Sequence, residues 1–501
     1  MSEPLDRLAR QASETHVVVA GGGIAGLVAA RECAKVGLRV TVLEASDAFG
    51  GVVRSAEVGG LLLDVGAESF ATRGGVVSAL LDELGLADAV VSPNPAGAWV
   101  AGVPGVGAAP LPKGGVLGIP DNPFAPDVRR IIGWRGTWRA YLDRLRPPLT
   151  IGHQRSLGTL VRTRMGTRVL DRLVAPVTSG VYSARPDDID VDLAAPGLNA
   201  ALTRTGSLSG AVAEMRLSRA TAKPADAPAS DVPVPTEAAR RPAPGGAVQG
   251  IAGGMSRLVD ALVAELAEFG VDLRTEVSVE ALHPAGAGWN VATSDDADPL
   301  AADAVIVALP EGPARALLAP VVPALEEGDP VAPVVEVVTL VVDASALDAA
   351  PRGTGVLTVP GSHVAKALTH STAKWDWVRD ATAPGVHVVR VSFGAQGEEP
   401  ATAALDDDAA AHLALSEAAA MLGVELSAST LRAARRVRYV QSQPAATIGR
   451  AAETAAARGA VHAVAGLGVT GAWVAGTGLA QVIPDARAEA DRVRSAALWH
   501  H

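Results

Sequence analysis

The hydrophobic positions near the start of the chain change period twice within thirty residues. His16–Ala20 is a short apolar, β-branched run, which is typical of a strand buried on both faces. Residues 27–36 carry Leu, Ala, Cys and Val at helical spacing, and Gly37 is placed to end that helix. Residues 38–43 form a second apolar run. Strand, helix and strand in this order predict a parallel βαβ unit and an α/β fold.

The turn between the first strand and the helix reads Gly21-Gly22-Gly23-Ile24-Ala25-Gly26 and matches G-x-G-x-x-G. Gly21 permits a tight turn, Gly23 lets the backbone approach a pyrophosphate, and Gly26 lets helix and strand pack closely. Glu44 follows the second strand, where it can accept hydrogen bonds from both hydroxyls of an adenosine ribose. A glycine motif alone is weak evidence in a chain with 53 glycines, and a structural turn is the alternative. Strand, glycine turn, helix, second strand and acid, in this order, together predict a dinucleotide site.

The rest of the chain predicts a second sheet and a helical region. Helices are expected at 76–86, 253–270, 409–422 and from 479 to about 497, and strands at 61–70, 271–279, 304–310, 334–342, 355–359, 386–393 and 471–478. Residues 93–120 are expected to form loops or a hairpin. The predicted domains are a dinucleotide-binding unit in three parts (1–92, 247–312 and 439–501), a substrate domain (93–121 and 313–438), a helical basic subdomain (122–211) and a flexible linker (212–246).

Charge is unevenly distributed along the chain. The net charge is −11, yet residues 122–186 hold 12 arginines, no lysine and three aspartates, an excess of nine positive charges. Three interpretations stay open: solvated arginines on helix surfaces, docking on an anionic membrane, and attraction of an acidic substrate. Nucleic acid is not expected as a partner, because the whole chain is acidic and carries no recognised nucleic-acid motif.

Compartment and cysteine chemistry follow from simple counts. No apolar run approaches transmembrane length, and residues 1–15 lack the apolar segment of a signal peptide. Cys33 is the single cysteine and lies within the first predicted helix, which favours a buried apolar role. We therefore expect a cytoplasmic protein, with peripheral contact to the inner face of the membrane as an open alternative.

Several motifs together resemble those of a known flavoprotein family. Gly50-Gly51-Val52-Val53-Arg54 resembles the extended FAD fingerprint of amine-oxidase-like flavoproteins. The segments 66–70 with Arg73, 175–182, 253–255 and 476–483 are similar to the oxygen-dependent protoporphyrinogen/coproporphyrinogen oxidase family, and most of all to its bacterial coproporphyrinogen type. The resemblance covers nearly the whole chain except 212–246. Two positions depart from it: Ala480-Gln481-Val482 replaces the family's Pro-Asp-Cys, and Tyr439 stands where tryptophan is common.

The resemblance implies an α/β fold, with an FAD-binding Rossmann-like domain of the amine-oxidase type, a mixed-sheet substrate domain and a helical subdomain. It implies noncovalent FAD, since the C-terminal motif holds no cysteine or histidine for a covalent link. Arg73 is expected to hold a substrate carboxylate and Gly180 to lie beside the macrocycle. The expected cofactor-binding residues are Gly21, Gly23, Ile24, Ala25, Gly26, Glu44, Ala45, Gly51, Val52, Arg54, Gly66, Ala67, Glu68, Ser69, Val277, Tyr439, Gly478, Leu479, Ala480 and Gln481.

The implied reaction removes hydrogen from a porphyrinogen and passes the electrons to O2, giving H2O2, in heme biosynthesis. No histidine or acid stands out as a general base, so we name no catalytic residue and no metal ligand. The alternatives are a flavin amine oxidase, a carotene-desaturase-like enzyme and a flavin-binding protein without turnover. Three points stay open: coproporphyrinogen or protoporphyrinogen as substrate, monomer or homodimer, and handover of product to a later heme-pathway enzyme.

Overall fold

A five-stranded parallel sheet unites the beginning, middle and end of the chain. The computed structural model describes residues 10–146, 155–221, 248–295, 298–326, 332–440 and 446–499. The sheet order is β12 (Asp272–Arg274), β2 (Arg39–Leu43), β1 (His16–Ala20), β16 (Ala304–Val307) and β22 (Leu467–Val469), and every neighbouring pair is parallel. Val17 to Ala20 are fully buried, which confirms the predicted central strand. The return of the chain to its first unit is confirmed by β16 and β22.

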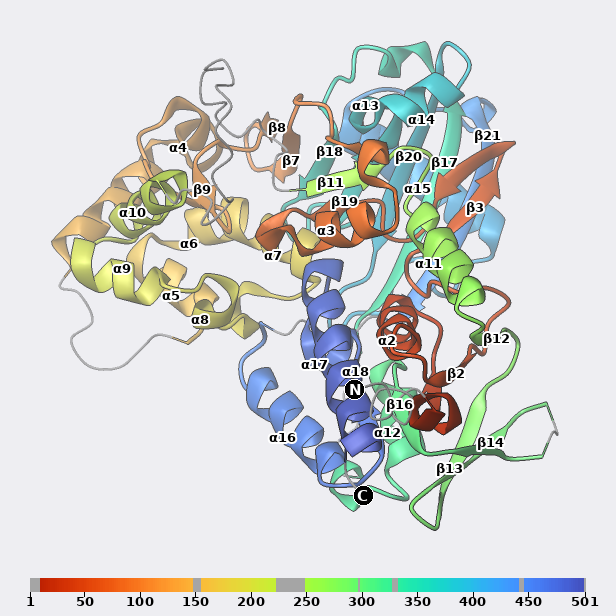
Figure 1. Cartoon of the computed structure of the whole chain (residues 1–501). Helices are drawn as coiled ribbons and strands as arrows, with labels where there is room; N and C mark the ends of the chain where they lie inside the picture. Colours follow the sequence, from red (N-terminus) through yellow and green to blue (C-terminus); the bar gives the residue numbers. More distant parts are fainter. Residues whose placement is uncertain are drawn as a thin grey trace, which may run out of the picture.

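Both faces of this sheet are covered (Figure 1). Helices α2 (Ile24–Ala34), α11 (Ser256–Glu268) and α18 (Leu479–Trp499) pack on one face, where Val17 and Val19 enter a shared core. Val18 and Ala20 point to the other face, in a core with α12 (Glu311–Leu318) and α16 (Arg450–His462). The antiparallel sheet of β13 (Val279–Ala285), β14 (Gly288–Thr293) and β15 (Leu300–Ala302) adds Trp289 to that second core.

A seven-stranded mixed sheet forms the second part. Its order is β21 (Leu431–Val440), β17 (Val334–Asp343), β20 (Val386–Phe393), β19 (Ala367–His370), β18 (Gly355–Thr358), β7 (Ala98–Val103) and β8 (Gly107–Pro110), with only β18 and β7 parallel. Helix α15 (Asp407–Leu422) covers one face. The hairpin β3 (Ser55–Val58) and β4 (Leu61–Asp64) packs on the other, together with α13 (Ser371–Lys374) and α14 (Asp376–Ala381). The predicted second sheet is confirmed.

The helical lobe lies beside these two sheets and has its own hydrophobic core. It holds α4 (Pro126–Tyr141), α5 (Leu157–Arg164), α7 (Ala175–Tyr182), α9 (Leu198–Thr205) and α10 (Leu208–Thr221). Helix α4 kinks at Gly133, whose φ is +67°. The carbonyls of Ile131 and Ile132 next to the kink accept hydrogen bonds from Arg172 and Arg168, at 3.0 and 3.2 Å. Some arginines of this region therefore stabilise the fold through hydrogen bonds to backbone carbonyls.

Two sequence expectations differ from the structure. The strand expected at 471–478 is the short helix α17 (Ala472–Ala475), because Gly471, Gly476 and Gly478 adopt positive φ and interrupt an extended run. The first part of the linker expected at 212–246 is helical, since α10 continues to Thr221 and Val212 and Met215 pack into the core of the lobe. Residues 222–246 lie outside the described residues. The hairpin expected within 93–120 is confirmed by β7 and β8, whereas the domain boundaries stay a prediction.

Candidate functional site

The glycine-rich turn after β1 has the geometry that a dinucleotide requires. Gly21 has a φ of +105°, and a Cβ there would lie 2.7 Å from the carbonyl oxygen of Ala308. A Cβ on Gly26 would lie 1.9 Å from the Gly21 oxygen, so the helix could not pack this closely with any other residue. A Cβ on Gly23, by contrast, would meet no atom within 4 Å. The loop therefore leaves open space in front of Gly23, at the N-terminus of α2, where free N–H groups can receive phosphate oxygens.

Glu44 turns its carboxylate toward this loop. Its Oε2 accepts a hydrogen bond from the Gly22 amide at 2.8 Å, and its Oε1 accepts from the Ser46 amide and hydroxyl at 2.9 and 2.7 Å. The backbone oxygen of Glu44 accepts from the Val277 amide at 3.0 Å, which ties this end of β2 to the next segment. The side chain is thus held beside the loop, where an adenosine ribose would lie in a dinucleotide fold.

Three segments far apart in sequence meet at the front of the loop. A Cβ on Gly51 would lie 3.5 Å from the Gly23 Cα, and the Gly50 amide donates to Gly22 at 2.8 Å. A Cβ on Gly66 would lie 2.0 Å from the Val52 oxygen and 3.0 Å from the Tyr439 hydroxyl. Tyr439 Oη is buried and has no partner among the described residues. An unpartnered hydroxyl here fits a polar ligand lying along Gly51, Val52 and Gly66.

Two residues expected at the cofactor have protein partners for their charges. The Glu68 carboxylate is buried in ion pairs with Lys374 and Arg390. Burial by itself would raise the pKa of Glu68, but the charges of Lys374 and Arg390 lower this pKa to about 2. Arg54 pairs with Asp47 at 2.6 Å on the surface. The side chain of Glu68 is therefore committed to holding its segment, and a cofactor contact at this position would fall to its backbone.

Arg390 anchors the same segment to the mixed sheet. Its guanidinium donates to the carbonyl oxygens of Val65 and Gly66 as well as to Glu68. Sequence reasoning missed both Arg390 and Lys374. A signal existed, because Arg390 stands between two valines in a valine-rich strand, and a charge inside such a strand is seldom buried without a partner.

The C-terminal motif presents a helix N-terminus. Gly478 has a φ of +106°, and a Cβ there would meet nothing within 4 Å. Helix α18 begins at Leu479, and the first amides of a helix have no intrahelical acceptor. The Gln481 amide differs from the expectation, since it donates to the Gly478 oxygen at 3.0 Å. Any donation to a ligand would therefore come from Leu479 and Ala480.

These features fit FAD. The open space at Gly23 and Gly478, the unpartnered Tyr439 hydroxyl and the orientation of Glu44 all suit a long anionic dinucleotide. Other residues expected at the cofactor lie close by in the chain or packed against these elements: Ile24, Ala25, Ala45, Ala67, Ser69 and Val277.

Solvent reaches the face of the mixed sheet that points away from α15. Directly paired residues lie on the same face of a sheet. One row across β18, β19, β20, β17 and β21 is only partly buried, and it is apolar except for Ser392: Leu357, Ala367, Ser392, Val337 and Val437. The next row faces α15 and is at most 2% exposed at Val356, Leu368 and Val391. A partly exposed apolar row between packed elements suits a flat apolar ligand.

Helix α7 closes one end of this row. A Cβ on Gly180 would lie 2.4 Å from Leu357 Cδ2, so the glycine lets the helix approach β18 closely. Tyr182, two residues onward, is half-buried. Burial raises the pKa of Tyr182, and the charge of Arg73 acts on it in the opposite direction. Arg73 therefore lies close enough to Tyr182 for its charge to act on the end of α7, and the roles expected of Arg73 and Gly180 toward a substrate stay predictions.

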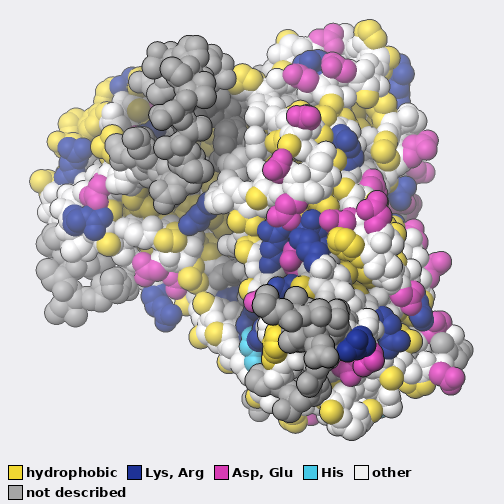
Figure 2. All heavy atoms as spheres, in the orientation of Figure 1, with side chains coloured by type: hydrophobic (Ala, Val, Ile, Leu, Met, Phe, Trp, Pro, Cys, Tyr) yellow, Lys and Arg dark blue, Asp and Glu magenta, His cyan; other side chains and the backbone are white. Residues whose placement is uncertain are grey.

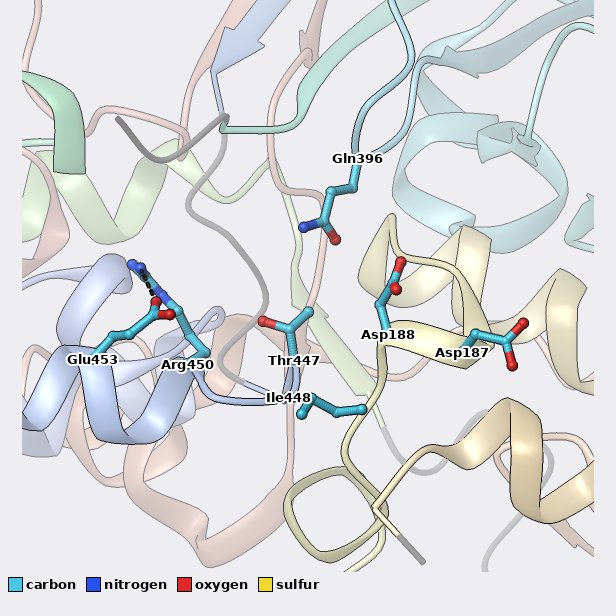
Figure 3. A pocket seen from close by; sticks show the side chains of 7 residues that line it. All are labelled: Asp187, Asp188, Gln396, Thr447, Ile448, Arg450 and Glu453. Carbon is cyan, nitrogen blue, oxygen red and sulfur yellow. Dashed lines mark ion pairs between the residues drawn. The ribbon is translucent and has the colours of Figure 1, made fainter. Parts of the chain in front are cut away.

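A cavity of about 230 Å³ lies where the helical lobe, the mixed sheet and α16 meet (Figure 3). Asp187 and Asp188 enter from the lobe, Gln396 from the loop after β20, and Arg450 with Glu453 from α16, while Thr447 and Ile448 complete the lining. Arg450 is already paired with Glu311 and Glu453. Asp187 is likewise paired with Arg162 at 2.7 Å, so most charges of the lining are already compensated by partners within the protein.

Known proteins resemble this chain over nearly its whole length. Residues 24–494 match the model of the family described as flavin containing amine oxidoreductase. Coproporphyrinogen III oxidase from Mycobacterium bovis is 30% identical over 470 residues, covering 92% of this chain and 93% of that protein. The enzyme of the same name from Propionibacterium freudenreichii is 29% identical over 502 residues, covering 97% and 92%. A crystal structure from Exiguobacterium sp. 255-15, provisionally named protoporphyrinogen oxidase, superposes with a TM-score of 0.79 at 24% identity, covering 96% and 99%.

Proposed function

The chain belongs to the family of flavin containing amine oxidoreductases, and we propose that it oxidises coproporphyrinogen III to coproporphyrin III with O2 as the final electron acceptor. The observation that carries the proposal is the similarity to coproporphyrinogen III oxidases over most of the chain, at 30% identity over 92% of its length. The expected family, fold class and FAD cofactor are confirmed. When bound, FAD would supply two-electron oxidation with O2 as acceptor, and three such rounds would remove the six hydrogens and form three H2O2.

We assign the cofactor to the space in front of the glycine loop. Glu44 would accept the ribose hydroxyls, the N-terminus of α2 would receive the pyrophosphate, and Leu479 and Ala480 would offer amide donors from α18. Gly51, Val52 and Gly66 would line the path between them, with the Tyr439 hydroxyl beside Gly66. The contacts are mostly to backbone, which explains how Ala480-Gln481 could replace the family's more usual side chains.

The substrate would lie along the partly exposed row from Leu357 to Val437. Leu357, Ala367 and Val337 supply an apolar floor for a macrocycle. Gly180 lets α7 pack closely against Leu357 at one end, and Arg73 would bind a propionate near this end, because a guanidinium matches a carboxylate in two hydrogen bonds. This arrangement favours a porphyrinogen over a small amine, since the row is long and its charged end is positive.

Peripheral contact with an anionic membrane is part of the proposal. No helix in the described residues is both long and apolar enough to cross a bilayer. Helix α4 and the turn after it nevertheless expose four large apolar side chains at helical spacing: Trp134 (58%), Trp138 (55%), Leu142 (46%) and Leu145 (77%). Hydrophobic side chains gather on this outer edge of the helical lobe in Figure 2.

The same α4 face is positively charged. Arg130, Arg135, Arg144 and Arg146 are exposed around it, whereas Asp143 is buried in an ion pair with Arg164. Tryptophan, leucine and arginine together favour the boundary between anionic headgroups and acyl chains. The protein should therefore sediment with phosphatidylglycerol vesicles and not with phosphatidylcholine vesicles. Trp138→Ser should weaken this binding and Trp499→Ser, exposed at the end of α18, should not; equal binding by both variants would exclude α4 as the contact.

The proposed activity is tested by comparing substrates. Purified protein should convert coproporphyrinogen III to a fluorescent porphyrin under air, with a higher kcat/KM than for protoporphyrinogen IX, and should leave benzylamine and putrescine unchanged. Turnover of an amine without turnover of either porphyrinogen would overturn the proposal in favour of an amine oxidase.

A further inference from the structure

Ser392 carries the one polar side chain of the partly exposed row. In the register of the mixed sheet it pairs directly with Val337 of β17 and with Ala367 of β19, so it lies in the middle of the row. The residue is half-buried, and among the described residues its hydroxyl has no hydrogen-bond partner. Because water reaches it only in part, this hydroxyl can gain a hydrogen bond from a ligand that covers the row.

The row lies against the segment that is assigned to the flavin. Side chains two residues apart on a strand point to the same face, so Arg390 and Ser392 share a face of β20. Val437 and Tyr439 share the same face on β21. Arg390 donates a hydrogen bond to the Gly66 oxygen, and a Cβ on Gly66 would lie 3.0 Å from the Tyr439 hydroxyl. The row, which contains Ser392 and Val437, runs between these two contacts, so Gly66 lies beside this part of it.

The helical lobe bounds the other end of the row. Leu357 belongs to the row on β18, and its Cδ2 would lie 2.4 Å from a Cβ on Gly180 of α7. Between this contact and the Gly66 segment, the row is apolar except for the Ser392 hydroxyl. A ligand that matches this surface is apolar over most of its area and has a hydrogen-bonding group near its centre.

A reduced macrocycle has these properties. In a porphyrinogen the pyrrole rings are joined by saturated CH2 bridges, so every ring keeps an N–H donor and can tilt out of the mean plane. In the porphyrin product the macrocycle is flat and conjugated, only half of the nitrogens carry hydrogen, and these hydrogens point into the centre of the ring. A hydroxyl oxygen below the ring can therefore accept a hydrogen bond from the substrate but not from the product.

We propose that the Ser392 hydroxyl oxygen accepts a hydrogen bond from a pyrrole N–H of the bound porphyrinogen, and that Ser392 thereby distinguishes the reduced macrocycle from the porphyrin product. This inference rests on the proposed function. The hydrogen bond is lost when oxidation is complete, so the row binds the product less tightly than the substrate and favours its release.

The test compares substrate and product in the same variants. Ser392→Ala should raise KM for coproporphyrinogen III about three- to tenfold, as expected for loss of a hydrogen bond between neutral groups. The Kd of coproporphyrin III, measured by the change in its fluorescence on binding, should change by less than about twofold, because the flat ring offers the hydroxyl no N–H. Ser392→Thr keeps the hydroxyl on a residue that suits a strand and should stay near wild type in both values. Ser416→Ala removes an exposed hydroxyl from α15, which covers the opposite face of the sheet, and should change neither value.

Two results would overturn the inference. An equal weakening of substrate and product binding in Ser392→Ala would mean that the hydroxyl shapes the row without sensing the oxidation state of the ring. An unchanged KM for coproporphyrinogen III would remove Ser392 from the substrate site. Flavin content and melting temperature should equal those of wild type in every variant, so that a change in KM reports on the row and not on the fold. If the wild-type protein oxidises neither porphyrinogen, the proposed function itself fails, and this outcome is distinct from an active wild type beside a Ser392→Ala variant with unchanged KM.

Discussion

Replacing Glu44 with glutamine tests the cofactor site at its most specific side chain. The carboxylate already accepts three hydrogen bonds, from Gly22 at 2.8 Å and from Ser46 at 2.9 and 2.7 Å. A carboxylate offers about four acceptor sites, so one site remains for a ribose hydroxyl, and the Ser46 hydroxyl can rotate to free another. Glutamine keeps one acceptor oxygen and turns an NH2 group toward either the Gly22 amide or the Ser46 amide. It thus loses the charged acceptor for the ribose and also weakens the loop.

A hydrogen bond to a charged group contributes about 1.5–3 kcal/mol, so Glu44→Gln should weaken FAD binding by about ten- to a hundredfold. The assay is titration of the apoprotein with FAD, followed by quenching of flavin fluorescence. Ser46→Ala removes one donor without changing the charge and should weaken binding much less. Glu57→Gln removes an exposed carboxylate on β3 and should leave affinity unchanged. An affinity of Glu44→Gln within about twofold of wild type would refute the assignment of the ribose to Glu44.

Four further outcomes are expected. Acid precipitation should release all of the flavin, and colour that stays in the pellet would contradict noncovalent binding. Arg73→Ala should raise KM for the porphyrinogen several-fold at normal flavin content, and Arg73→Lys should recover only part because lysine lacks the bidentate fork; wild-type values in both variants would move the carboxylate elsewhere. In stopped-flow experiments, flavin reduction by the substrate should be slow in Gly478→Val, or this variant should lack flavin, whereas the reduction rate of Gln481→Ala should be nearly normal. A normal reduction rate in Gly478→Val would exclude the start of α18 from the site. The folded pKa of Glu68, about 2, lies below its usual 4.5, so the ionised carboxylate stabilises the fold above pH 4.5 and this contribution is lost as pH falls toward 2. Acid unfolding of Glu68→Gln should therefore depend less steeply on pH in this range than that of the wild type. Identical unfolding curves would contradict the buried ion pairs of Glu68 with Lys374 and Arg390.

The parts of the fold with strong local patterns could be predicted from the sequence. The run His16–Ala20 is apolar on both faces because β1 is covered by helices on both sides, and the glycine spacing after it follows from steric contacts that only glycine avoids. The position of Glu44 at the end of β2 could also be predicted, since the acid directly follows an apolar strand. In these cases a few neighbouring residues determine the geometry.

Long-range partners could not be predicted in this way. Glu68 belongs to a motif of the family and was assigned to the cofactor, yet its side chain pairs with Lys374 and Arg390, about three hundred residues later. Nothing near Glu68 in the sequence indicates these partners.

The arginines of the helical lobe had three interpretations, and the structure separates them by position. Arg168 and Arg172 satisfy carbonyls at the Gly133 kink, and Arg164 pairs with buried Asp143. Arg130 and Arg135 stay exposed beside Trp134 and Trp138. Positive charge counted along a sequence therefore contains structural and surface arginines in unknown proportion, because hydrogen bonds to distant carbonyls leave no local signature.

The most direct test of the proposed function is the anaerobic half-reaction. The yellow holoprotein, mixed with coproporphyrinogen III in the absence of O2, should lose its yellow flavin absorbance. Because one flavin accepts two of the six electrons that the conversion to a porphyrin releases, full porphyrin absorbance should appear only after O2 is admitted, as the yellow colour returns and H2O2 forms. The comparison mixture contains a primary amine in place of the porphyrinogen and should stay yellow. A flavin that keeps its colour with coproporphyrinogen III and bleaches with the amine would contradict porphyrinogen oxidation by this chain.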